Sequence, residues 1–140
     1  MNINFGKAVV GGVVGTVMMT VVAVYVAPVM GMPPMNPATM LADQMGGMVA
    51  AGWVAHFMIG TILAIVYAAV SGRIPGTPPL RGALFGIAPW LLAQIAVLPM
   101  MGMPVFSGSM SMAMGSLIGH LVYGGVPGAI YGQSSVAVAR

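Results

Sequence analysis

The chain has 140 residues, of which 59% are hydrophobic and 4% are charged, and its net charge is +3. Because soluble domains carry about 25% charged residues, this composition excludes a soluble fold and predicts one integral membrane domain over residues 1–140. The absence of cysteine excludes disulfides, thiolate metal sites and iron–sulfur clusters. A single acidic residue excludes catalysis by paired carboxylates, so we expect no enzymatic activity.

Four long apolar segments, taken in chain order, predict four transmembrane helices. A helix of about 20 residues crosses about 30 Å of hydrocarbon. The first segment is too long for the apolar core of a secretory signal and has no small-residue cleavage site, so we expect it to be retained. The predicted fold class is all-α, an integral membrane four-helix bundle with helices near residues 8–27, 48–70, 82–99 and 111–132.

The charged residues predict the orientation of the helices in the membrane. With four crossings, all the basic residues fall on the side of the termini, namely Lys7, Arg73, Arg81 and Arg140. Asp43, the only acidic residue, falls on the opposite side. Positive residues mark the cytoplasmic side of a bacterial membrane. We therefore expect a multi-pass protein of the bacterial inner membrane with both termini in the cytoplasm.

The second half of the chain repeats two features of the first. The segments PVMGMP at 28–33 and PMMGMP at 99–104 agree at five of six positions. The second and fourth helices each carry a histidine, a glycine four residues later and a tyrosine seven residues after that. We interpret these matches as two tandem helical hairpins, about residues 1–72 and 73–140. Two copies with two crossings each would be related by a pseudo-two-fold axis along the membrane normal.

His56 and His120 are the candidate cofactor-binding residues. Each lies on a stripe of small residues spaced four apart, which share one helix face. Under the predicted symmetry, the second and fourth helices face each other and the two imidazoles meet at one depth. Paired imidazoles are axial ligands of b-type haem, and Gly60 and Gly124 would leave room for the flat macrocycle. The propionates of such a haem would need a nearby lysine or arginine, but no basic residue lies in the predicted outer half of the protein, away from the cytoplasm.

A plainer alternative is that each histidine donates one hydrogen bond to a neighbouring helix. Intramembrane polar residues commonly join helices in this way. If the glycine stripes of the second and fourth helices were in direct contact, the two helices would lie too close for an iron between their histidines. Direct packing and haem binding therefore exclude each other for this pair of helices. The candidate hydrogen-bond partners are Thr16, Thr20, Gln94 and Ser116.

Methionine is concentrated near the predicted outer loops, where twelve of the sixteen methionines lie. Thioethers are soft ligands that suit Cu(I), so an alternative function is a periplasm-facing protein that binds or transports Cu(I). Flexible packing and partner contact are the other use of methionine. The first loop also predicts a short interfacial helix over residues 37–45. The candidate copper ligands are Met30, Met32, Met101 and Met103.

The H-x-x-x-G pattern in the second and fourth helices, with a Pro/Gly turn after the first, resembles small bacterial four-helix membrane families of unknown function. The resemblance implies the fold and no particular activity. From the residues themselves, the leading hypothesis is an accessory subunit of a larger bacterial membrane complex for redox or respiratory electron transport. Its expected partners are the lipid bilayer and other membrane subunits, and not nucleic acid, because there is no basic face. A purely structural, lipid-packing subunit is the remaining alternative.

Overall fold

The computed structural model describes residues 3–132, and this part of the chain is helical and contains no strand. Four helical spans are long and apolar enough to cross a membrane, which confirms the all-α fold and makes the chain a multi-pass membrane protein. Arg140, which the sequence assigned to the cytoplasmic side, lies outside the described residues. The spans are Phe5–Val29, Val49–Arg73, Pro78–Met100 and Met110–Gly132.

The first and third spans are each built from an α-helix, a π-helical turn and a further α-helical turn. The first loop adds a short helix, one 3-10 turn ends the second span, and another precedes the fourth span. In chain order the elements are α1 (Phe5–Val21), η1 (Val22–Val26), α2 (Ala27–Val29), α3 (Pro37–Gln44), α4 (Val49–Val70), η2 (Ser71–Arg73), α5 (Pro78–Leu92), η3 (Ala93–Val97), α6 (Leu98–Met100), η4 (Val105–Gly108) and α7 (Met110–Gly132).

Local sequence explains where two of these helices begin. Asn4 precedes α1, and its side chain accepts a hydrogen bond from the backbone N–H of Lys7 at 3.0 Å. Asn36 precedes α3 in the same way and accepts from Ala38 at 3.0 Å, while Pro37 fills the first helical position. Both asparagines satisfy backbone donors that have no partner within the helix. The short helix expected in the first loop is thereby confirmed.

The two repeated segments fold into the same turn. Each follows a π-helical turn, and the fourth residue of each is a glycine in the left-handed region, Gly31 at φ 81° and Gly102 at φ 80°. Met32 N–H donates to Ala27 O at 3.0 Å, and Met103 N–H donates to Leu98 O at 2.9 Å. This crossing bond and the left-handed glycine define a Schellman cap. Glycine stands in both segments because only glycine adopts this conformation without steric cost.

The glycine stripes of the second and fourth spans pack within their own halves. A Cβ atom on Gly60 of α4 would collide with Thr16 of α1, and a Cβ atom on Gly124 of α7 would collide with the backbone of Gly82 in α5. The expectation that α4 and α7 face each other through these stripes is therefore wrong. The physical reason is that α1 and α5 also carry small residues at the required spacing, so each stripe finds a partner helix beside it in the chain.

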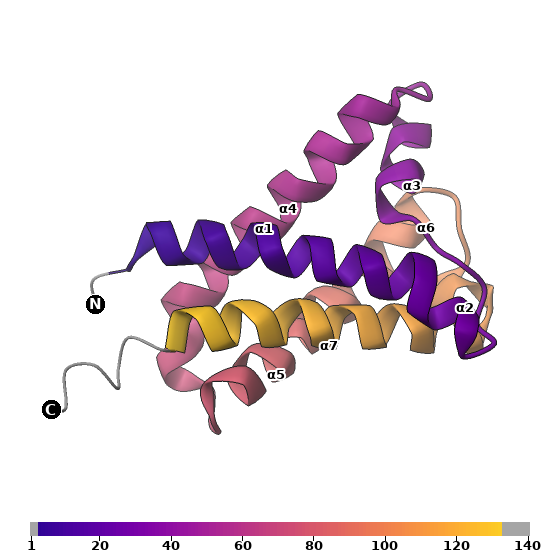
Figure 1. The fold of residues 1–140 in the computed structure, drawn as a ribbon. Helices are drawn as coiled ribbons and strands as arrows, with labels where there is room; N and C mark the ends of the chain where they lie inside the picture. Colours follow the sequence, from indigo (N-terminus) through magenta and orange to yellow (C-terminus); the bar gives the residue numbers. More distant parts are fainter. Residues whose placement is uncertain (1–2, 133–140) are drawn as a thin grey trace, which may run out of the picture.

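The bundle opens at one end. We call the end that carries α3 and the two Schellman caps the loop end, and the end near Phe5 and Gly132 the terminal end. Figure 1 shows α4 leaning away from α1 and α7 toward the loop end, with α3 beside its first turns. A Cβ atom on Gly52 of α4 would collide with Ala38 and Ala42 of α3. Helix α3 thus covers the loop-end part of α4, and a space remains inside the bundle.

Candidate functional site

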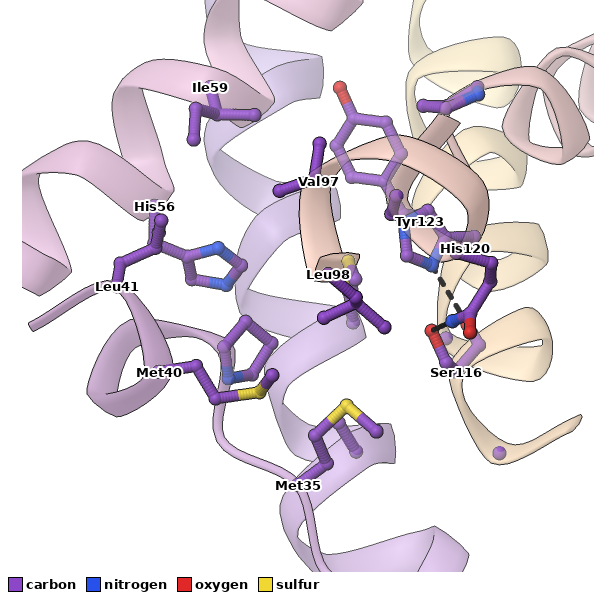
Figure 2. A pocket seen from close by; sticks show the side chains of 18 of the residues that line it. Met35, Met40, Leu41, His56, Ile59, Val97, Leu98, Ser116, His120 and Tyr123 are labelled. Carbon is purple, nitrogen blue, oxygen red and sulfur yellow. Dashed lines mark hydrogen bonds between the residues drawn. The ribbon is translucent and has the colours of Figure 1, made fainter. Parts of the chain in front are cut away.

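A cavity of about 240 Å³ lies at the loop end, bounded by residues of α1, α3, α4, α5, η3 and α7. Its wall is mainly aliphatic and methionine side chains. Both predicted histidines line it, one from each half of the chain, and Figure 2 shows their rings approaching the cavity from opposite sides. The polar lining residues are Thr16, His56, Gln94, Ser116, His120 and Tyr123.

His56 is held by one ring nitrogen. The side chain is 6% exposed, and its Nε2 lies 3.0 Å from Thr20 Oγ1 on α1. The Thr20 hydroxyl donates its only proton to Thr16 O at 2.8 Å, so Nε2 carries the hydrogen and donates to Thr20. Nδ1 then keeps a free lone pair, and it has no hydrogen bond in the described structure. The expected partnership with Thr20 is confirmed.

His120 is held in the complementary way. Its Nδ1 lies 2.8 Å from the carbonyl oxygen of Ser116 in the same helix. A carbonyl only accepts, so Nδ1 carries the hydrogen and Nε2 keeps the free lone pair. His120 therefore bonds its own helix, contrary to the alternative in which each histidine joins two helices. Within residues 3–132, the Nε2 atom has no hydrogen-bond partner.

A series of side-chain hydrogen bonds holds the cavity wall beside His120 in place. Gln94 of the π-helical turn η3 is 1% exposed, and its Nε2 donates to Ser116 Oγ at 3.3 Å. Its Oε1 accepts from Ser107 Oγ at 3.1 Å. Both ends of the amide are thus satisfied, as a buried amide requires. Isolated π-helical turns are frequent at functional sites, and the turn places Gln94 on the cavity wall.

Tyr123 is a site residue that the sequence analysis missed. It is 2% exposed on α7, lines the cavity, and its hydroxyl donates to the carbonyl of Gly60 on α4. This bond links the two histidine-bearing helices, which otherwise touch little. The available signal was its position three residues after His120, which places it near the same helix face.

The predicted glycine positions do not add space to the cavity. Gly60 lines the cavity, but Thr16 fills the place where its side chain would lie. Gly124 is not among the lining residues and packs against Gly82. The space that the sequence analysis assigned to a macrocycle at these positions is therefore taken by α1 and α5.

The structure does not bring the four predicted copper ligands together at one site. Met101 lines the cavity, whereas Met30 is 59% exposed, Met32 lies against Gly115, and Met103 is outside the lining. Four further methionines line the cavity, and only a placement of the helices in space identifies them as a group. The cavity methionines are Met19, Met35, Met40, Met101 and Met112.

The cavity reaches the apolar surface of the bundle. Three lining residues of the spans are also well exposed: Ile59 of α4 at 42%, Leu92 of α5 at 58% and Val97 of η3 at 40%. All three belong to spans apolar enough to cross a membrane, so the opening between α4 and the third span faces the lipid region.

Comparison with other proteins gives a family and no activity. No curated protein matches the chain, and no solved structure matches it either. The model of a family of unknown function, DUF6789, matches residues 3–138, and the chain belongs to this family.

Proposed function

We propose that the chain is an accessory, non-enzymatic subunit of a respiratory or other redox complex in the bacterial inner membrane, and that it holds a ligand in the cavity between His56 and His120. One observation carries the proposal. Two imidazoles from different halves line the same cavity, His56 buried and His120 half-buried, and each has one ring nitrogen bonded within the protein and one free. A role limited to helix packing would not require free nitrogens facing a shared cavity.

The proposed orientation has both termini in the cytoplasm. Lys7, Arg73 and Arg81 stand at the terminal end of their spans, whereas Asp43 stands in α3 at the loop end. Basic residues favour the cytoplasmic side. The cavity then lies in the half of the membrane nearer the periplasm.

We also propose that the fold derives from two tandem hairpins. The supporting observations are the π-helical turns and Schellman caps, which recur in both halves with the same hydrogen bonds. The halves differ in their loops, because α3 occurs in the first and the 3-10 turn η4 in the second. Helix α3 occupies the space beside α4, and this difference supports an asymmetric cavity in place of a symmetric haem cleft.

Haem b between the two histidines stays a prediction, and the cavity favours a smaller ligand. Pockets for drug-sized ligands enclose about 300–1,000 Å³, and this cavity encloses about 240 Å³. No lysine or arginine lines it to bind the propionates. Besides a small organic molecule, Cu(I) is a candidate ligand, because two neutral imidazoles and several thioethers suit a soft monovalent ion.

One preparation tests the proposal and separates its ligands. We expect the protein, purified from its native membrane with mild detergent, to retain an organic molecule in an extract analysed by mass spectrometry. In His56→Leu and His120→Leu the retained amount should fall about tenfold, because each variant removes one recognition group. Folding should survive, since Thr20 still bonds Thr16 and an intramembrane hydrogen bond contributes only about 0.6 kcal/mol.

The same purified sample shows whether the ligand is haem or copper instead. A Soret band that is lost in both histidine variants would establish haem, and stoichiometric copper lost in Met40→Leu but kept in Met30→Leu would establish a copper site. Met30 is the matched control because it is exposed and outside the cavity. An empty wild-type cavity, or one whose contents ignore both histidine variants, would contradict the proposed function.

A further inference from the structure

We propose that the cavity binds the ring of a lipid-soluble hydroquinone, whose two hydroxyl groups donate hydrogen bonds to His56 Nδ1 and His120 Nε2. This inference rests on the proposed function and names the ligand class of that site. It concerns binding alone and includes no electron-transfer step.

The hydrogen-bond pattern determines what the cavity recognises. Thr20 fixes the proton of His56 on Nε2, and the Ser116 carbonyl fixes the proton of His120 on Nδ1. Both free nitrogens are therefore acceptors. A ligand that satisfies both must carry two donors, because an acceptor that the bound ligand covers and leaves unpaired is costly. Hydroxyl groups at two ends of a ring meet this requirement, and the two carbonyls of an oxidised quinone do not.

The shape and lining of the cavity favour an aromatic ring between these acceptors. The two imidazoles approach from opposite sides in Figure 2, with the aliphatic Val97 and Leu98 between them in this view and Met35 and Met40 beside them. Thioethers make favourable contacts with aromatic rings, and five methionines line this cavity. A ring with polar groups at its opposite ends and an apolar body matches this arrangement.

The lateral opening fits a ligand that carries an apolar tail. Ile59, Leu92 and Val97 line the cavity and are exposed on the apolar surface. A ring that enters between α4 and the third span would leave its tail among the lipid chains. A soluble diol would not need an opening inside the membrane-spanning region.

Three probes test the donor requirement: tetramethylhydroquinone under anaerobic conditions, its dimethyl ether, and the oxidised tetramethylbenzoquinone. Binding is measured by calorimetry on the full chain in detergent micelles. We expect the hydroquinone to bind at least tenfold more tightly than the ether and the quinone, which have the same six-carbon skeleton and ring methyl groups but no donors. Equal affinities for the hydroquinone and the ether would overturn the inference.

Substitutions locate the binding. We expect His56→Leu and His120→Leu each to weaken hydroquinone binding about tenfold, and Ile59→Trp to block it by filling the opening. Ile62→Trp is the matched control, because Ile62 is 52% exposed on the same helix and is outside the lining. Hydroquinone binding that is equally affected by Ile59→Trp and Ile62→Trp would place the site elsewhere and overturn the inference.

The two proposals fail differently. If Ile59→Trp and the histidine variants abolish a ligand retained from the native membrane while the hydroquinone does not bind, the ligand class is wrong and the cavity function holds. If the retained ligand is unaffected by Ile59→Trp and by both histidine variants, the cavity function itself is wrong.

Discussion

Gly124→Leu is expected to destabilise the bundle by about 3 kcal/mol or more, at the upper end of the range for overpacked cores. Any side chain at this position meets the backbone of Gly82 and Gly86, which cannot rotate away as a flexible side chain does. Helices α5 and α7 must then separate along their closest contact. The measurement is the unfolding free energy from a denaturing-detergent titration followed by circular dichroism.

Gly125→Leu is the matched control for this prediction. It adds the same side chain one position later, where a Cβ atom meets its nearest neighbour, Pro79 O, at an ordinary distance of 3.8 Å. We expect its unfolding free energy to stay within about 1 kcal/mol of the wild-type value, because the half-buried position forces no close contact with backbone. Equal destabilisation by the two variants would show that α5 and α7 do not pack through Gly124.

Gly52→Leu is expected to release α3 from α4 and expose the cavity at the loop end. A side chain at Gly52 meets Ala38 and Ala42 of α3. Helix α3 has eight residues, and isolated helices shorter than about 12–15 residues are marginal in water, so α3 depends on this contact. Backbone amide exchange over Pro37–Gln44 should accelerate at least tenfold, as measured by hydrogen–deuterium exchange and mass spectrometry.

Ala50→Leu serves as the control for α3, because Ala50 is exposed on the same helix two residues earlier. Its exchange rates over α3 should match those of the wild type. The ligand retained by the protein should also fall in Gly52→Leu and persist in Ala50→Leu, since Met40 and Leu41 of α3 line the cavity. Unchanged exchange in Gly52→Leu would mean that α3 is held by other contacts.

The sequence predicted the spans and the repeated turn because these depend on local properties. Apolar length alone specifies a membrane-crossing helix, and P-x-M-G-M-P encodes a Schellman cap through its glycine. The sequence also named Thr20 among four candidate partners of the histidines, because it lies at a similar depth to them, and the structure pairs it with His56. These inferences needed no knowledge of how the helices pack.

The packing partners could not be read from spacing. A stripe such as Gly52, His56 and Gly60 shows that a helix makes a close contact, but not with which helix. All four spans carry small residues at this spacing, and only the three-dimensional arrangement pairs α4 with α1 and α7 with α5. For the same reason, the sequence did not identify Tyr123, Gln94 or the cavity methionines, whose common property is a shared wall formed by distant segments.

The most direct test of the account is whether positions 56 and 120 face one cavity although α4 and α7 touch little. The chain contains no cysteine, so the double variant His56→Cys/His120→Cys places the only two thiols there. A short fluorogenic cross-linker with two thiol-alkylating groups should join them, whereas Ile62→Cys/His120→Cys, with one thiol on the exposed face of α4, should give only single labelling. Equal cross-linking of the two pairs, or cross-linking of the control pair alone, would contradict the shared cavity.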